Sequence, residues 1–540
     1  MFDLRRRLLL QSGLIGLGAA LSPLRAEGLM RGFTHGVASG DPRQESVILW
    51  TRYVGAGDTP LKVEIADDAE FGRVVATFDA LARADRDFTA KPEATGLKPG
   101  RWYFFRFTAP DGTRSEVGRT RTLPQGRVES FRIAAFSCAN FGFGWFNAYA
   151  HAAQRNDIDL VLHLGDYIYE NGRDSYPTPA ETTPGRLIDP PAETVALDQY
   201  RRRYATYRAD PDLQRLHQLW PCIAIWDDHE SANDAWKDGA QNHQSATEGD
   251  WQVRKAAAIR AYYDWLPMRE VPYDAADIGD LATLIRLDTR LEGRDKQLDI
   301  TDALAGATDA RAALVAFRDG PLNDPARQLL GAPQESWYGK QLAASVKRGQ
   351  RWQLVAQQVL TGKVRVPGDA SPAWLGGEGS ARWRLRMTAG VAAGRLGIGY
   401  KLDMWDGYPA ARERALGFAQ AAGANLVSLA GDSHNAWAFN LTNGGKSAGV
   451  EFATPAVTSP GFESELKGIA PEALATSLKA ANPEIAWCDT ARRGYMMVTL
   501  TREAARCDWT LLETIREKGV LTAQTVTATS ARGSRRLTVA

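Results

Sequence analysis

The chain has 540 residues, of which 44% are hydrophobic and 24% are charged, and it contains 16 Trp. A chain of this length exceeds one ordinary hydrophobic core, so we expect at least two folding units; the composition excludes wholesale disorder and collagen-like structure. The 65 basic and 64 acidic side chains leave a net charge of +1, so no overall field favours nucleic acid or an anionic membrane. Four scattered cysteines are too few for a disulfide scaffold.

Residues 1–26 are predicted to be an export signal. Arg5, Arg6 and Arg7 precede three leucines and a short apolar stretch that ends near Leu24. A charged start, a short apolar segment and a polar exit are typical of a signal peptide, and the arginine pair resembles a twin-arginine signal. We therefore expect the twin-arginine export machinery as a partner and a periplasmic or secreted protein. No later window approaches eighteen apolar residues, so no membrane span is expected in the mature protein.

Residues 30–125 are strand-like and are expected to form a small β-sandwich domain. Apolar runs between turns are typical of strands, and they lie at 46–51, 61–65, 74–78 and 102–107. The run Leu-Lys-Pro-Gly-Arg-Trp-Tyr at 97–103 is similar to the tyrosine corner of immunoglobulin and fibronectin-III sandwiches. The sequence therefore predicts a fibronectin- or Ig-like sandwich.

Residues 126–515 have the pattern of an α/β domain. Buried-strand runs alternate with helical stretches such as 145–155 and 197–219, and these runs lie at 131–138, 159–166, 221–228, 352–356 and 425–432. Strands separated by helices predict buried sheets with helices on their faces. The region 301–395, with a Gly-rich break at 375–379, is expected to be a lid or an insertion. Residues 516–540 are expected to be a C-terminal tail.

Four of the predicted strands end in residues that can bind a metal. These ends carry Cys138, Gly165-Asp166-Tyr167-Ile168-Tyr169-Glu170, Asp227-Asp228-His229-Glu230 and Gly431-Asp432-Ser433-His434-Asn435. In open α/β sheets the ligand crevice lies outside the carboxyl ends of the strands, so the four sets can converge. Hard oxygens with one thiolate suit iron(III) and a harder divalent ion better than structural zinc. The residues predict a dinuclear metal site.

Each of these residues also has an ordinary structural explanation. An Asp at a strand end usually caps a helix or a turn, Cys138 alone is more often a small buried hydrophobe, and Tyr169 can simply pack. His163 lies within a predicted strand and is expected to be a structural histidine. The recurrence of carboxylates, imidazoles and one thiol at four strand ends, in a chain with only 7 His, favours the metal site.

The ordered motifs resemble a known family. Phe-Ser-Cys, Gly-Asp-x-Ile-Tyr-Glu, Asp-Asp-His-Glu and Gly-Asp-Ser-His, with Trp-Asp-Gly-Tyr-Pro at 405–409, the export signal and the preceding sandwich, closely resemble the PhoD-type alkaline phosphatase and phosphodiesterase family. The resemblance covers about 33–511. This family belongs with the calcineurin-like metallophosphatases, and the family's metal site is similar to that of purple acid phosphatases. The resemblance implies a metallophosphatase-type sandwich of two β-sheets flanked by helices, preceded by the small β-sandwich.

The same resemblance implies a mixed metal centre. It implies iron(III), Fe³⁺, bound by Cys138, Asp166, Tyr169 and His434. Asp166 would bridge to one or more calcium ions, Ca²⁺, held also by Asp228 and Asp432. The sequence departs from the broader superfamily at three positions, because Cys stands where Asp is usual, Asp228 where Asn is usual, and Asp432 where His is common. These replacements favour oxygen-loving calcium over zinc at the second position.

Two further residues are candidates beside the metals. His229 is expected to bind phosphate or donate a proton, and with Asp228 it makes up the catalytic pair of candidates. Asn233 lies four residues beyond His229 and on its face if that segment is helical. It is a weaker candidate for a calcium or substrate contact.

The charge of a phosphate anion suggests the mechanism. Two or three cations would clamp the phosphoryl oxygens, lower the pKa of a bound water and hold that water in line with the leaving alkoxide. A protonated His229 would neutralise developing charge or protonate the leaving group. We expect an exported phosphoric ester hydrolase acting on small organic phosphate esters, and the near-zero net charge argues against long polyanions. The alternative is a phosphodiesterase or phospholipase D-like enzyme acting on lipid or polymer phosphodiesters.

Other classes of function fit the sequence less well. The G-x-S-x-G match at 445–449 lies between a turn and a returning strand, whereas a nucleophile elbow needs a strand before it and a helix after it. Asn440 stands where the first glycine of a phosphate-binding loop belongs. A non-enzymatic binding protein with a closed, structural metal is the alternative from a different class, and it would hydrolyse no phosphate ester.

Overall fold

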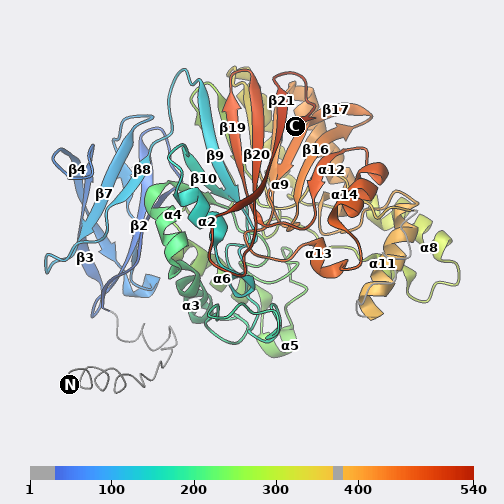
Figure 1. Cartoon of the computed structure of the whole chain (residues 1–540), viewed down its shortest axis with the longest axis horizontal. Helices are drawn as coiled ribbons and strands as arrows, with labels where there is room; N and C mark the ends of the chain where they lie inside the picture. The colour runs from blue at the N-terminus through green and yellow to red at the C-terminus, as the bar shows by residue number, and fades with distance from the viewer. Residues whose placement is uncertain (1–30, 369–380) are drawn as a thin grey trace, which may run out of the picture.

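The computed structural model describes residues 31–368 and 381–540, so the predicted export signal and the Gly-rich break at 375–379 lie outside the described residues. The described strands form three sheets. In Figure 1 the smallest sheet lies at one end of the molecule, and helices α8 (Ala310–Phe317) and α11 (Ala381–Gly394) lie at the other. Within the described ranges, no helix combines the length and the apolar character needed to cross a membrane.

The four-stranded sheet comes from the N-terminal part of the chain. It is antiparallel in the order β4-β3-β7-β8, with β3 Thr59–Ala66, β4 Val74–Ala82, β7 Trp102–Thr108 and β8 Gly118–Arg121. Alternate residues of β7 are buried, as the two-residue period of a strand requires. The Lys98 backbone N–H donates to Tyr103 Oη at 2.9 Å, which confirms the predicted tyrosine corner.

The other N-terminal strands continue into the largest sheet. They are β1 Gly32–Gly40, β2 Ser46–Val54, β5 Thr89–Ala90 and β6 Glu93–Thr95. β1 pairs in parallel with β11 where Gly40 meets Cys222, yet Val47 and Leu49 of β2 pack in one cluster with Val63 and Phe105 of the small sheet. The small sandwich therefore shares a sheet with the rest of the chain, and the limits of the 30–125 domain stay a prediction.

The largest sheet has the order β22-β21-β20-β19-β9-β10-β11-β1-β2-β5, with β6 on β2. Its remaining strands are β9 Ser130–Phe136, β10 Leu160–His163, β11 Cys222–Ala224, β19 Gly494–Thr501, β20 Ala504–Leu512, β21 Thr522–Ala531 and β22 Thr538–Val539. The last two strands lie within 516–540. That stretch is therefore part of the sheet and not a tail, because β21 is rich in Thr and pairs along its length with β20.

The seven-stranded sheet has the order β12-β13-β14-β15-β17-β16-β18. Its strands are β12 Asp274–Ile278, β13 Ala282–Arg286, β14 Trp352–Ala356, β15 Leu426–Ala430, β16 Ala436–Asn443, β17 Lys446–Ala453 and β18 Ile485–Asp489. β16 and β17 form an antiparallel hairpin. The predicted turn and returning strand around 445–449 are confirmed, and no nucleophile elbow exists there.

The two large sheets pack face to face. One core cluster contains Val161 and Val498 from the first sheet with Leu354 and Val427 from the second. Each such aliphatic side chain, when fully buried, contributes about 1.5–3 kcal/mol. Trp509 Nε1 also donates to the backbone carbonyl of β17 at 2.9 Å. The predicted sandwich of two sheets is confirmed.

Helices cover the outer faces of this sandwich (Figure 1). They are α2 Asn147–Ala153, α3 Leu197–Arg208, α4 Pro211–Leu219, α5 Ser245–Glu248, α6 Trp251–Trp265, α9 Ala332–Lys347, α12 Pro409–Ala422, α13 Phe462–Glu465 and α14 Pro471–Ala481. A separate group consists of α7 Ile300–Leu304, α8 and α11. The single helix expected at 197–219 is two helices, because Asp210 caps α4 and Pro211 is its first residue.

The region 301–395 divides into two parts. β14 lies within the second sheet and α9 covers it, so this part belongs to the main domain. By contrast, α7, α8 and α11 share a small separate core that includes Leu314, Phe317 and Ala393. Only this second part projects from the sandwich as an insertion (Figure 1).

His163 lies in β10 inside the core and is 2% exposed. Its Nε2 lies 2.9 Å from Tyr149 Oη. Burial lowers the pKa of His163 from 6.5 to about 3. The ring is therefore neutral in the folded protein at ordinary pH, and its contact to Tyr149 agrees with the structural role predicted for it.

We expect the free energy of unfolding to fall as the pH drops from about 6.5 toward 3. In this range His163 is protonated in the unfolded chain but stays neutral in the folded protein, so lower pH favours the unfolded state. One such histidine contributes up to about 1.4 kcal/mol per pH unit to this slope. His163→Gln should therefore flatten the slope. Urea unfolding at several pH values measures it, and an unchanged slope in the variant would contradict the assignment.

Candidate metal centre

The two large sheets bring the ends of five strands to one place. Cys138 follows β9, Asp166 follows β10 and Asp228 follows β11 in the first sheet, while Arg290 follows β13 and Asp432 follows β15 in the second. β9, β10 and β11 run parallel to one another, as do β13, β14 and β15. The carboxyl ends within each sheet therefore share one edge, where α/β proteins place their ligands.

The backbone is strained at four residues of this cluster. Cys138, Asp166, Asp432 and His434 have φ of 58°, 55°, 58° and 61°. A left-handed backbone is uncommon for residues other than glycine and costs on the order of 1–3 kcal/mol each. Such strain concentrates at functional sites. Four strained residues in one cluster indicate that their side chains are held for a purpose other than stability.

Two glycines allow the strand ends to approach. A Cβ on Gly165, whose φ is +101°, would lie 2.4 Å from Asp227 Cβ. A Cβ on Gly431 would lie 2.3 Å from Ser137 Oγ. Any larger residue would push apart β10 and β11 in the first case, and the two sheets in the second.

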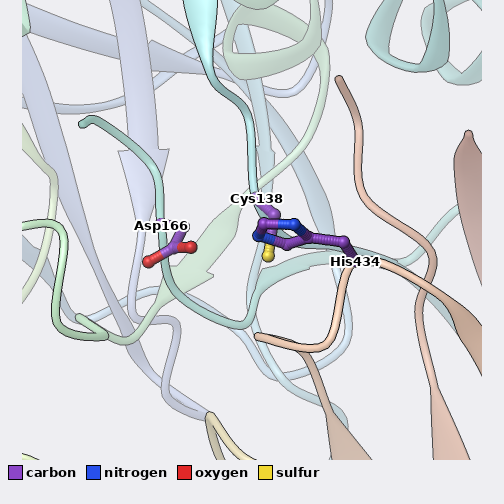
Figure 2. Close-up of side chains that lie close together, drawn as sticks. All are labelled: Cys138, Asp166 and His434. Carbon is purple, nitrogen blue, oxygen red and sulfur yellow. The ribbon is translucent and has the colours of Figure 1, made fainter. Parts of the chain in front are cut away.

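The first group of ligand atoms joins Cys138, Asp166 and His434. One atom of each lies within 4.8 Å of the others, and Figure 2 shows the three side chains close together. Tyr169 completes the group, because its Oη donates to Asp166 Oδ2 at 2.8 Å and lies 3.4 Å from His434 Nε2. Ser459 Oγ lies 2.6 Å from the same Oη. The four residues assigned to iron by resemblance thus lie in mutual contact range.

Two further groups overlap the first. Asp166, Asp228 and His229 form one group, and Asp227, Asp228 and Asp432 form another, each with ligand atoms within 4.8 Å. Asp166 belongs to the first two groups and Asp228 to the last two. The three groups are therefore one continuous site with carboxylates at the shared positions.

The chemistry of the site fits metal ions. Asp166 Oδ1, Asp227 Oδ2 and Asp432 Oδ2 are buried without a hydrogen-bond partner, and buried carboxylate oxygens are rarely left unpaired. Burial raises the pKa of all three carboxyl groups, and neighbouring carboxylates add to the effect. A bound cation would stabilise the ionised forms and use the unpaired oxygens.

His229 is held by a carboxylate on its far side. Its Nδ1 lies 2.6 Å from Glu170 Oε2. Burial alone would lower the pKa of His229, but Glu170, followed by Asp166 and Asp228, raises it well above the usual value. Burial raises the pKa of Glu170, but His229, with the hydrogen bonds from Asn242 and the Asn233 backbone, lowers it below its usual value. This pairing favours a protonated ring that faces the site as a donor.

Glu230 organises the backbone of the site. Its carboxylate accepts hydrogen bonds from the backbone N–H groups of Asp166, Tyr167 and Asp227, at 3.1, 2.6 and 2.7 Å. One side chain thereby ties the loop after β10 to the loop after β11. The motif Asp-Asp-His-Glu contains this residue, but a sequence does not reveal which backbone groups a buried carboxylate will bind.

Arg290 is the main residue that the sequence interpretation missed. It is fully buried and forms ion pairs with Asp227, with Asp403 at 2.7 Å and with Asp432 at 3.2 Å. It lies four residues beyond β13, so it has the same strand-end position as the predicted ligands. This strand-end position is the feature of the sequence from which Arg290 could have been predicted as a site residue.

Asn233 lies differently from the prediction. The segment after His229 consists of turns and not a helix, so the four-residue spacing does not place the two side chains on one face. The Asn233 side-chain amide donates to Gln241 at 3.0 Å, and its backbone N–H donates to Glu170 at 2.8 Å. The side chain of Asn233 therefore bonds to Gln241, while its backbone contacts the carboxylate that holds His229.

Removal of the Arg290 charge tests how the carboxylates are held. Arg290→Met should lower the free energy of unfolding by roughly 3–5 kcal/mol, because it leaves several buried carboxylates unpaired. The matched variant Arg127→Met breaks an exposed pair with Glu129 and should cost about 0–1 kcal/mol. Urea unfolding of the two variants measures the difference, and equal costs would show that Arg290 does not hold this cluster.

Comparisons with known proteins agree with this geometry. Residues 133–509 match the family model for PhoD-like phosphatase, and residues 19–124 match the one for its N-terminal domain. The chain is 32% identical over 513 residues to alkaline phosphatase D of Bacillus subtilis (strain 168), which covers 90% of this chain and 79% of that protein. A solved structure of PhoD matches with a TM-score of 0.75 at 29% identity, covering 94% of this chain and 92% of the other. The chain therefore belongs to the PhoD-like phosphatase family and is a phosphoric ester hydrolase.

Proposed function

We propose that this phosphatase hydrolyses small organic phosphate esters with a mixed metal centre at the strand ends. Iron(III) would be held by Cys138, Asp166, Tyr169 and His434. Calcium would be held by the all-oxygen set of Asp166, Asp228 and Asp432. The observation that carries the proposal is the overlap of the three ligand groups. One end of the site offers a thiol, a phenol and an imidazole, the other end offers carboxylates, and shared carboxylates connect the two ends.

The two ends of the site differ in donor chemistry. A thiol, a phenol and an imidazole gather around one side of Asp166, and such a set, once the thiol and the phenol lose their protons, suits a transition metal. The groups on the other side are carboxylates, which suit calcium. Burial raises the pKa of Asp228, but Arg290, His229 and the backbone N–H of Asp234 together lower it, which favours the charged carboxylate there. Asn233 stays the weakest of the ligand candidates, since its amide is bound to Gln241.

Bound cations at these positions would polarise the phosphoryl oxygens and lower the pKa of a bound water. The chain itself supplies the proton donor and holds it in orientation. His229, held at Nδ1 by Glu170, keeps its other ring nitrogen available to protonate the leaving oxygen or to bind a phosphoryl oxygen. Arg290 holds Asp432 and Asp227 in place, so it acts as a positioning residue.

Elemental analysis with an optical spectrum tests the metal assignment. The purified protein should contain about one iron per chain with calcium, and a phenolate bound to iron(III) should colour it. Tyr169→Phe should lose the visible absorption band and most of the hydrolysis of phosphate esters. Tyr149→Phe, which removes a buried phenol bonded to His163, should keep both. Zinc alone, or a band that survives in Tyr169→Phe, would overturn the ligand set.

We also propose that the twin-arginine export machinery carries the protein to the periplasm or out of the cell. The support is the sequence of residues 1–26, with Arg6 and Arg7 ahead of three leucines. Replacing both residues by lysine keeps the charge and removes the guanidinium groups. Cell fractionation should then find the double variant inside the cell, and export of that variant at the wild-type level would exclude the route.

A further inference from the structure

The two carboxylate oxygens of Glu170 have different partners. Oε2 lies 2.6 Å from His229 Nδ1. Oε1 accepts two hydrogen bonds at 2.8 Å, one from the Asn233 backbone N–H and one from the Asn242 side-chain amide. Glu170 is fully buried, so these groups of the protein fix the orientation of its carboxylate. A rotation of the carboxylate would move or break the contact to His229.

Asn242 is held at its backbone on both sides. It lies in the segment 231–244, which consists of turns and bends with a single bridge and so has no regular hydrogen bonding of its own. The Asn242 backbone N–H donates to the Asn233 carbonyl at 3.2 Å. The Asn242 carbonyl accepts a hydrogen bond from Arg254 at 2.9 Å. These two bonds hold Asn242 in the place from which its amide reaches Glu170.

Arg254 ties this segment to two helices. It lies on α6, is 1% exposed, and donates from Nε to Tyr200 Oη of α3 at 3.0 Å. Its other guanidinium nitrogens pair with Glu193 at 2.7 Å and with Glu248 at 2.8 Å. Hydrogen bonds between charged groups are among the strongest that proteins make. Because α3 and α6 pack side by side (Figure 1), Arg254 gives Asn242 a rigid support.

We propose that Asn242 is a positioning residue that holds Glu170 in the orientation which keeps His229 directed at the leaving oxygen. The inference rests on the proposed function, in which His229 protonates that oxygen. Asn242 belongs to none of the ligand groups found among the described residues. Loss of its amide therefore changes the orientation of the proton donor and leaves the metal ligands in place.

Two phosphate monoesters distinguish this role from a general structural one. Ethoxide is a strong base and needs a proton as it leaves, whereas 2,4-dinitrophenolate is a weak base and leaves without one. We expect Asn242→Ala to lower kcat/KM on ethyl phosphate by roughly 10- to 100-fold, since a small misplacement of a catalytic group has effects of this size. On 2,4-dinitrophenyl phosphate kcat/KM should stay near the wild-type value. The holoenzyme is assayed by phosphate release, and its iron and calcium content should be unchanged.

Three further variants locate the effect. Asn242→Asp keeps the size of the side chain but replaces the donor by a carboxylate that repels Glu170, so its selective loss should be at least as large. His229→Ala sets the upper limit, with a loss of about 10²–10⁴ on ethyl phosphate. In the control Asn443→Ala, the amide removed donates to the Glu413 carbonyl at 3.2 Å, at the β16–β17 hairpin. This variant should match the wild type on both esters.

The outcomes separate the two claims. If the metal-loaded wild type hydrolyses neither ester, the proposed function fails and the inference with it. If His229→Ala loses both esters equally, His229 is not the proton donor. If His229→Ala shows the selective loss but both Asn242 variants either match the wild type or lose both esters equally, the positioning role is wrong while the proposed function stands.

Discussion

The concentration of negative charge at the strand ends is the constraint on which this structure depends. Asp166, Asp227, Asp228 and Asp432 are buried within a few ångströms of one another. Charges in such a place are costly unless positive groups compensate them. Arg290 supplies one positive charge and His229 supplies another. Some carboxylate oxygens remain without a partner in the protein. Their negative charge is not fully compensated by Arg290 and His229, and this is the physical reason to expect cations there.

The fold keeps these charges together by rigid means. The ligands lie just beyond strands of two packed sheets, and four of them have a left-handed backbone that a free chain would avoid. Gly165 and Gly431 permit the close approach of the loops, while Glu230 ties two of the loops by their backbone N–H groups. Packing in the sandwich core stabilises the strained arrangement. Preorganisation of this kind is how enzymes hold charge where a reaction needs it.

The positions of the candidate ligands at the strand ends could be predicted from the sequence, whereas the residues that support them could not. Cys138, Asp166, Asp228 and Asp432 each follow a buried apolar run, and local pattern is enough to find such positions. Arg290 also lies just beyond a strand. Its role, however, depends on how the second sheet packs against the first sheet, and no local feature of the sequence determines that packing. The shared face of His229 and Asn233 depended on a helical segment, and the structure has turns there instead.

The features of the fold likewise fall into those that the sequence predicted and those that it did not. The tyrosine corner and the hairpin at 443–446 depend on neighbours in sequence and were predicted correctly. The addition of β1 and β2 to the largest sheet, and of β21 and β22 to its other edge, depends on contacts between distant segments.

Anomalous X-ray scattering from crystals of the purified protein tests the central claim most directly. Data collected on both sides of the iron absorption edge would locate iron without assumption about its ligands. The account predicts one iron peak among Cys138, Asp166, Tyr169 and His434, with a lighter cation between Asp166, Asp228 and Asp432. A zinc peak alone, or a peak away from these residues, would contradict it.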